Sequence, residues 1–304
     1  MLLRQNVHQS RSPRPRIEMC GPAAPPPLVS DQSEMLDTQS RNTMAKNLKL
    51  KIIERTAQII LARPESFNAL DLPTARELAE TLLSIALDNA IHGVVLTGTG
   101  AAFSAGGDIK GAVNHSRGPS QAFHELATHV HLCITEIHRM KKPVIAAING
   151  VAAGGGFSLA LACDFRIMAA SARLKQGFTS NALCIDAGGT FILPRLVGLA
   201  RALEIATFDE PIDANQALAW GLVTKITKDD DVLAEAMEMV RVVASKSLHT
   251  FGWSKALLTN SFETSLEAQL EKERQGLVNC VAHPDGEEGM HAFLEKRKPI
   301  FNRQ

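Results

Sequence analysis

Residues 141–174, KKPVIAAINGVAAGGGFSLALACDFRIMAASARL, contain the arrangement that decides the fold. Two short apolar runs, PVIAAING (143–150) and FRIMAA (165–170), are typical of buried strands. Between them, three consecutive glycines (154–156) open an apolar stretch that is long enough for a short helix. The order strand, glycine turn, helix, strand predicts a unit whose connection crosses over with a fixed, right-handed sense.

The same alternation extends on both sides of this segment. LKLKIIE (48–54) and TAQIILAR (56–63) have the pattern of two paired strands. A helix follows with Asp71 as its predicted N-cap, and another is predicted over residues 119–139. From about Asp213 onward only helical patterns remain. The sequence therefore predicts an α/β core with a helical end, which suits packing on another subunit or a lid as well as ordinary core.

The chain divides into three predicted regions. Residues 1–43 are rich in proline, serine and arginine, so we expect a disordered tail, or a start assigned too early with the folded protein beginning at Met44. Residues 44–212 form the predicted α/β core, and residues 213–304 form the predicted helical oligomerisation region.

Composition and charge exclude several functional classes. The formal net charge is zero, which offers no long-range field for gathering nucleic acid. No apolar run approaches the roughly 20 residues that span a bilayer, so no membrane partner is expected. The five cysteines are scattered and form no CxxC pair. They indicate neither a zinc site nor a disulfide framework, and they favour a reducing, cytoplasmic location without a bound metal.

Two glycine-containing loops are the candidate sites of chemistry. AAFSAGGDIK (101–110) ends a predicted strand, and NGVAAGGGFSLALACD (149–164) turns from a strand into a helix. Glycine lets a backbone N–H approach a ligand closely, and a helix N-terminus favours negative charge. The two loops could converge on one carbonyl oxygen, or the glycines could serve only tight turns. The second loop lacks the lysine and hydroxyl of a phosphate-binding P-loop and fits a dinucleotide motif only loosely.

Taken together, the motifs resemble the crotonase (enoyl-CoA hydratase/isomerase) superfamily from about Met44 to the end of the chain. The resemblance implies a ClpP/crotonase-like ββα-spiral core and a C-terminal helical region that forms a homotrimer or a dimer of trimers. It rests on six ordered stretches: RPESFNALD (63–71), AFSAGGDIK (102–110), the segment 141–174, GGTFILPRLVGLARALEI (188–205), ANQALAWGLVTKI (214–226) and EGMHAFLEKRKPIF (288–301).

The resemblance also implies a ligand, an acyl-CoA thioester. Coenzyme A would enter as part of this substrate, and no covalently bound cofactor is implied. The N–H groups of Gly107 and Gly155 would bind the thioester oxygen. The remaining residues expected in the substrate and CoA site are Phe67, Ala69, Asp108, Ile109, Lys110, Phe178 and Lys296.

The acid–base group is where this sequence departs from the hydratases it resembles. Those enzymes use two glutamates, and here the matching positions hold Ser158 and Phe178. Asp186 instead matches the aspartate of single-acid members, closest in pattern to the phenylacetate-type isomerases. Asp186 is thus the predicted sole acid/base for moving a double bond, although it could also be an N-cap for a helix starting at Ala187. His131 is a possible further site residue, because it matches an active-site histidine of the 4-chlorobenzoyl-CoA dehalogenases.

Other activities remain open at this point. They are hydration of an enoyl-CoA, dehalogenation or thioester hydrolysis with Asp186 as nucleophile, and CoA binding without catalysis.

Overall fold

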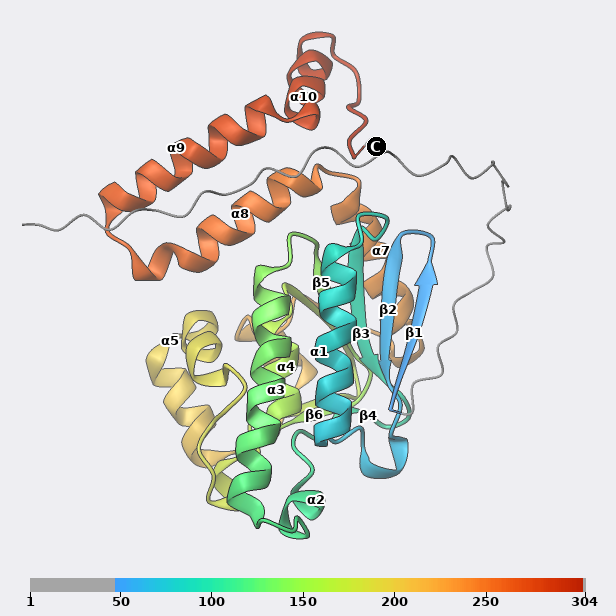
Figure 1. The fold of residues 1–304 in the computed structure, drawn as a ribbon, viewed down its shortest axis with the longest axis vertical. Helices are drawn as coiled ribbons and strands as arrows, with labels where there is room; N and C mark the ends of the chain where they lie inside the picture. Colours follow the sequence, from blue (N-terminus) through green and yellow to red (C-terminus); the bar gives the residue numbers. More distant parts are fainter. Residues whose placement is uncertain (1–46, 303–304) are drawn as a thin grey trace, which may run out of the picture. The chain divides into compact units, whose positions relative to one another are not determined.

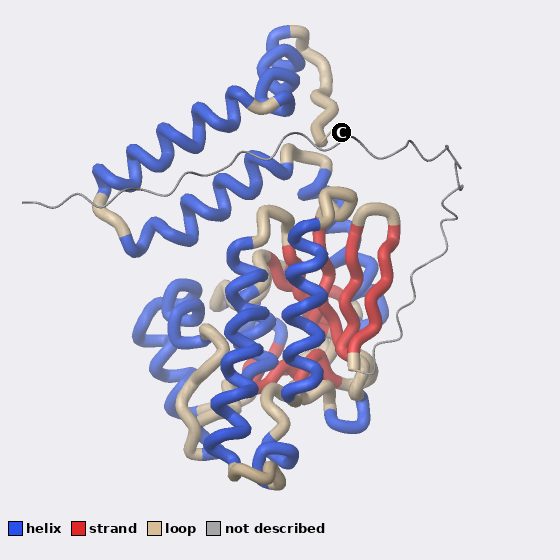
Figure 2. The backbone as a smooth tube through the Cα atoms, in the orientation of Figure 1, coloured by secondary structure: helices blue, strands red, loops and turns tan. Residues whose placement is uncertain are grey.

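The computed structural model describes residues 47–302, and the predicted tail of residues 1–43 lies outside them. The largest feature is a six-stranded sheet (Figures 1 and 2). Its first two strands pair antiparallel and the others are parallel. In spatial order the strands are β1 (Leu48–Ile53), β2 (Thr56–Leu61), β3 (Gly93–Gly98), β5 (Val144–Ile148), β7 (Phe165–Ala169) and β10 (Lys225–Thr227).

A second sheet has four short strands and completes the spiral. Along the chain, β3, β5 and β7 enter the large sheet, and the strand after each of them enters the small sheet. Helices then lead back to the large sheet, so each turn of the spiral consists of two strands and a helical connection. This arrangement confirms the predicted ββα-spiral core. The small sheet contains, in order, β4 (Ala102–Ser104), β6 (Val151–Ala153), β8 (Arg173–Lys175) and β9 (Ile212–Asp213).

Helices cover the sheets and continue beyond them. α1 and α3 lie side by side, α7 packs on β3, β5 and β7, and α8 lies along α9 (Figure 1). The helices are α1 (Leu72–Leu87), α2 (Ile109–Val113), α3 (Pro119–Arg139), α4 (Gly155–Ala162), α5 (Gly189–Phe208), α6 (Ala214–Ala219), α7 (Val232–Ala244), α8 (Leu248–Asn260), α9 (Leu266–Ala282) and α10 (Pro284–Leu294). Short 3₁₀ turns are η1 (Pro64–Ser66), η2 (Thr179–Asn181), η3 (Asp229–Asp231) and η4 (Ser261–Glu263). No helix within residues 47–302 is long and apolar enough to cross a membrane.

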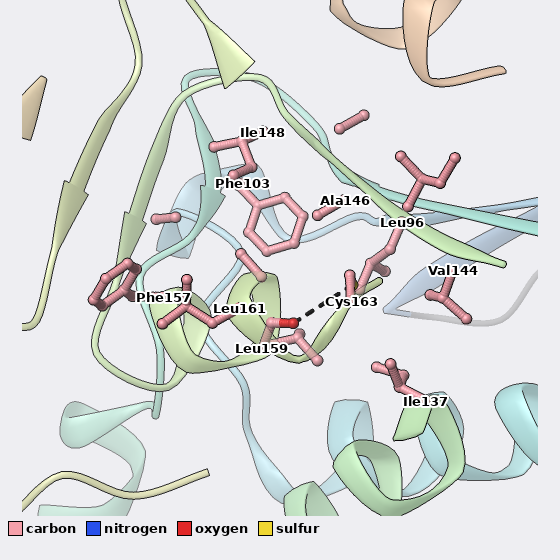
Figure 3. Packing of buried hydrophobic residues seen from close by; sticks show 14 of the residues in the cluster. Leu96, Phe103, Ile137, Val144, Ala146, Ile148, Phe157, Leu159, Leu161 and Cys163 are labelled. Carbon is pink, nitrogen blue, oxygen red and sulfur yellow. Dashed lines mark hydrogen bonds between the residues drawn. The ribbon is translucent and has the colours of Figure 1, made fainter. Parts of the chain in front are cut away.

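The core lies where α3 and α4 meet the sheets. Phe103 and Phe157 are among the largest fully buried side chains, and they lie with Ile137, Leu96 and Ile148 in one cluster (Figure 3). Burying an apolar side chain of this size contributes about 1.5–3 kcal/mol. The core therefore fixes the ends of β4 and β6, from which both glycine loops emerge.

Two local predictions have different outcomes. Asp71 caps α1 as predicted, because its Oδ1 accepts a hydrogen bond of 2.9 Å from the Thr74 N–H. The expectation of only helices after Asp213 is wrong at β10, which pairs in parallel with β7 as the edge of the large sheet. Three residues are too short a strand to produce an alternating pattern.

A buried ion pair joins α8 to the spiral. Lys255 Nζ lies 2.9 Å from Asp164 and also donates to the Ile137 carbonyl at 2.7 Å. Burial raises the pKa of Asp164, while the charge and hydrogen bond of Lys255 act in the opposite direction. The pair fixes the start of the C-terminal helices against α3.

Candidate active site

The two glycine loops meet because β4 and β6 are parallel neighbours. A Cβ atom on Gly106 would lie 2.7 Å from the backbone nitrogen of Gly155, and one on Gly156 would lie 2.2 Å from the Ser104 carbonyl oxygen. Both distances are too short for a side chain. Gly106 also has a φ of +89°, which an L-residue rarely adopts. Close backbone contact therefore explains these glycines.

Each loop contains a glycine whose N–H group has no hydrogen-bond partner among residues 47–302. Leu70 pairs with the chain around Gly107: its N–H donates to the Gly106 carbonyl, and its carbonyl accepts from the Asp108 N–H. This pairing leaves the Gly107 N–H unused. Gly155 is the first residue of α4, where an N–H has no acceptor within the helix. Among the hydrogen bonds of residues 47–302, none uses either N–H.

Both glycines line one small cavity of about 220 Å³. A carbonyl oxygen in it can accept hydrogen bonds from both N–H groups, which is the arrangement that stabilises an oxyanion. Within residues 47–302, Asp186 is the one carboxylate that lines this cavity. The others are mainly apolar: Leu70, Phe123, Leu126, Ala127, Val130, Phe178, Leu183, Cys184 and Ala187.

Asp186 is held by His131 across 55 positions of sequence, with 2.6 Å between His131 Nε2 and Asp186 Oδ1. A carboxylate that is ionised only accepts hydrogen bonds, and in that state Nε2 of His131 is the donor of this contact. The side chains are 54% exposed for His131 and 41% for Asp186, which leaves the carboxylate accessible from the cavity. The structure thus brings the possible site residue His131 to the predicted acid/base.

The alternative prediction that Asp186 caps a helix is wrong. α5 begins at Gly189, and its N-cap is Gly188, which has no side chain and a φ of +77°. The carboxylate of Asp186 therefore contacts His131 rather than the start of the helix.

The other predicted substrate residues are distributed unevenly. Phe178 lines the cavity, whereas Ser158 is buried in α4 with only 2% of its surface exposed. Phe67 is 57% exposed on the adjacent loop, and Ala69 is buried below it. Asp108 caps α2 by accepting from the Gly111 N–H. Ile109 and Lys110 are exposed at the start of the same helix.

Lys296 does not line this cavity; it follows α10 and is exposed. Its expected contact with the CoA phosphates stays a prediction. Among the described residues there is also no cluster of three or more side chains suited to hold a metal ion.

Sequence reasoning missed Arg63, which ties the two sides of the site together. Its Nη1 donates to the Ala69 carbonyl at 2.6 Å, and its Nη2 lies 3.2 Å from Asp108 Oδ2. Nη1 also lies 3.3 Å from Asp71 Oδ2. Arg63 thus links the 63–71 loop to the residue after Gly107. The indication in the sequence that Arg63 belongs to the site was its position at the start of the stretch RPESFNALD (63–71).

A buried carboxylate fixes the loop that carries Phe178. Asp209 accepts hydrogen bonds from the Gly177 and Ser180 N–H groups and from the Ser180 hydroxyl. Burial alone would raise the pKa of Asp209, but these hydrogen bonds outweigh it and lower the pKa below its ordinary value. The loop is therefore anchored through an ionised side chain.

Comparison with known proteins identifies the family. The family model described as "Enoyl-CoA hydratase/isomerase" matches residues 52–304. The crotonyl-CoA hydratase of Syntrophomonas wolfei is 35% identical, over 84% of this chain and 98% of its own. The 1,2-epoxyphenylacetyl-CoA isomerase of Escherichia coli is 33% identical, over 80% of this chain and 93% of its own.

A solved structure has the same fold. The structure of an enoyl-CoA hydratase from Polaromonas sp. JS666 superposes with a TM-score of 0.80. It is 34% identical and covers 84% of this chain and 99% of its own. With its spiral core, this chain belongs to the crotonase (enoyl-CoA hydratase/isomerase) family, whose enzymes act on acyl-CoA thioesters.

Proposed function

We propose that this enzyme moves a carbon–carbon double bond within an unsaturated acyl-CoA, with Asp186 as its sole acid/base. The observation that carries the proposal is the lining of the cavity: among residues 47–302, Asp186 is the one carboxylate that lines it together with Gly107 and Gly155. A single group that takes and returns a proton is sufficient for isomerisation, which neither adds nor removes water.

The chemistry follows from these three positions. The N–H groups of Gly107 and Gly155 bind the thioester oxygen, and Asp186 removes a proton from C2 of a 3-enoyl-CoA. The C–H electron pair moves into a dienolate, and the two N–H groups stabilise the negative charge on its oxygen. When the dienolate collapses, the C2–C3 double bond forms and the former C3–C4 double bond takes the proton back from Asp186 at C4. Each oxyanion donor typically contributes about 2.7–4 kcal/mol to such a transition state. His131 keeps the Asp186 carboxylate oriented throughout.

Hydration is less well supported. It needs a water molecule activated for addition, and the two positions of the hydratase glutamates hold Ser158 and Phe178. Ser158 is 2% exposed within α4, and the phenyl ring of Phe178 carries no exchangeable proton. The similarity to a hydratase and to an isomerase is nearly equal, so identity alone does not favour either reaction.

The contact of 2.6 Å between His131 and Asp186 favours one further candidate. Asp186 could attack a substrate carbon, forming an aspartyl ester as the leaving group departs. His131 would then take a proton from water, and hydroxide would hydrolyse the ester and regenerate Asp186. This sequence predicts a covalent intermediate on Asp186 that mass spectrometry of the protein would trap.

The test compares a 3-enoyl-CoA with crotonyl-CoA in matched assays. We expect faster isomerisation of the first than hydration of the second. Asp186→Asn keeps the size of the side chain and should lower kcat about 10²–10⁴-fold with little change in thioester affinity. Faster hydration, or normal isomerisation by Asp186→Asn, would contradict the proposal. Binding of CoA esters without any turnover would indicate a non-catalytic homologue.

We also propose a homotrimer or dimer of trimers assembled through the C-terminal helices. Large apolar side chains are exposed there, with Leu258 at 69%, Phe293 at 82% and Leu294 at 75%. Such exposure is typical of surfaces that bind a partner. Light scattering after size-exclusion chromatography measures the mass, and a monomer at micromolar concentration would contradict this assembly.

A further inference from the structure

A second cavity lies beside the catalytic one. It has a volume of about 570 Å³ and lies between α3, α5 and α8. Its lining consists of Ile134, Thr135, His138, Arg139, Gly188, Phe191, Ile192, Gly252, Lys255, Ala256, Thr259 and Asn260. None of these residues lines the catalytic cavity, so this space has no part in the chemistry proposed above.

Both walls of the catalytic cavity continue into the second one. On α3, Val130 lines the first cavity and Ile134 the second. They are one helical turn, about 6 Å, apart on the same face. On the other wall, Asp186 and Ala187 line the first cavity, and Gly188 lines the second. The acid/base thus lies at the junction of the two spaces.

The partition between the cavities is thin and apolar. A Cβ atom on Gly188 would lie 3.2 Å from Ile134 Cγ2 and 3.6 Å from Ile192 Cδ1. Because Gly188 has no side chain, the tips of Ile134 and Ile192 lie against its backbone where the two cavities approach each other. The catalytic cavity is smaller than the roughly 300–1,000 Å³ usual for small-molecule sites, whereas the second cavity falls in that range. The second cavity therefore offers the volume that a longer acyl group would require beyond the catalytic cavity.

Arg139 is the cation of the second cavity that has no ion-pair partner among residues 47–302. The described lining also includes Lys255 but no aspartate or glutamate. Lys255 is already bonded to Asp164 and to the Ile137 carbonyl. Within residues 47–302, no hydrogen bond or ion pair involves the side chains of Arg139, His138 or Asn260.

Other charged groups near the second cavity do not neutralise the charge of Arg139. Glu263 interacts electrostatically with His138 but is not part of the lining. Asp164 is neutralised by Lys255. Arg139 is always charged, and its planar guanidinium matches a carboxylate with two parallel hydrogen bonds.

We propose that the second cavity binds the far end of the acyl group, and that this end carries a carboxylate held by Arg139. The inference rests on the proposed function, since it assigns the substrate class of the same site: ω-carboxyacyl-CoA esters. The thioester oxygen lies at Gly107 and Gly155, the reacting carbons lie at Asp186, and the chain passes between Ile134 and Ile192.

The experiment uses pairs of 3-enoyl-CoA esters of equal length that end in a carboxylate or in a methyl group. Wild type should show a higher kcat/KM for the carboxylate ester of a long pair. Arg139→Met keeps an unbranched stem and removes the charge. It should lower the carboxylate-to-methyl ratio of kcat/KM about ten- to hundred-fold, the usual effect of losing a hydrogen bond to a charged group. Arg241→Met is the matched control on α7: the Arg241 side chain bonds to Glu238 and is not part of the lining of either cavity, so the ratio should stay unchanged.

Two results would overturn the inference: a wild-type preference for methyl ends, or an unchanged ratio in Arg139→Met. Turnover of short methyl-ended esters reports on the proposed function separately. If no ester is isomerised, calorimetric titration with the saturated ester pairs still tests carboxylate binding by Arg139. The carboxylate ester must then bind more tightly to wild type than to Arg139→Met. Ile134→Phe narrows the passage and should raise KM for long esters more than for short ones. Equal effects on both would show that the acyl chain does not pass there.

Discussion

Gly155→Pro tests the oxyanion site with little disturbance of the fold. The substitution removes the Gly155 N–H, which has no acceptor within residues 47–302, so no existing hydrogen bond is lost. Gly155 is the first residue of α4, the position where proline fits a helix best. The preceding residue, Gly154, has φ 52° and ψ −127°, the mirror image of the extended conformation that proline requires before it. Glycine adopts that mirror image without strain.

The expected effect is large on rate and small on stability. Removal of one oxyanion donor raises the activation free energy by about 2.7–4 kcal/mol, which lowers kcat about 10²–10³-fold. Proline in a compatible conformation changes the free energy of unfolding by only about 0.4–1 kcal/mol, in the stabilising direction. Gly155→Ala is the matched control, because it retains the N–H and its Cβ would lie 3.7 Å from the nearest atoms, Gly106 Cα and Gly107 N.

The assay measures kcat on a 3-enoyl-CoA beside urea unfolding of all three proteins. The proline variant should lose far more activity than the alanine variant at similar stability. A folded Gly155→Pro protein with wild-type kcat would refute the reasoning, because the thioester oxygen could not then depend on this N–H.

Further predictions concern residues around the site. Arg63→Met removes hydrogen bonds to charged groups and should lower the free energy of unfolding by about 1.5–3 kcal/mol. It should also lower kcat by up to about 10²-fold if the Gly107 loop shifts by an ångström. Unchanged values in urea unfolding and steady-state assays would contradict the role of Arg63 in linking the two loops. Gly156→Ala should destabilise the fold, since its Cβ would lie 2.2 Å from the Ser104 carbonyl oxygen, and a wild-type melting temperature would count against this packing. The Asp209 carboxyl has a lowered pKa in the fold, so its contribution to stability is complete above the unfolded pKa of about 3.9 and is lost as pH falls through the lower folded value. Asp209→Asn should therefore reduce stability at neutral pH and flatten its decline in acid, which unfolding measured across pH would detect.

The regular elements were predictable because their signals are local. The helix predicted over 119–139 is α3 (Pro119–Arg139), and the Asp71 cap is present as expected. β10 was missed because a three-residue edge strand is defined by pairing with β7, more than fifty positions earlier, and not by its own pattern. Tertiary pairing decides such a segment.

The site was only partly predictable for the same reason. Glycine spacing located both loops, since glycine is required where backbones touch. Arg63 contacts Asp108, and His131 contacts Asp186. These pairs are 45 and 55 positions apart in the sequence, and no local pattern reveals them. The second cavity is likewise made by three helices that are distant in sequence.

The conformation around Asp186 explains why its capping role was a reasonable but wrong expectation. An aspartate directly before a helix is a common cap, but the helix begins at Gly189 rather than at the predicted Ala187, and Ala187 and Gly188 both have positive φ, 55° and 77°. A left-handed alanine costs about 1–2 kcal/mol, so local preference opposes this turn. Ala187 is nevertheless only 1% exposed and lines the catalytic cavity, so its packing holds the turn in place. The two residues rotate the Asp186 carboxylate away from the start of α5 and toward His131. Strain of this kind persists where the surroundings enforce it, and here the strained turn leaves the carboxylate in the cavity that Gly107 and Gly155 also line.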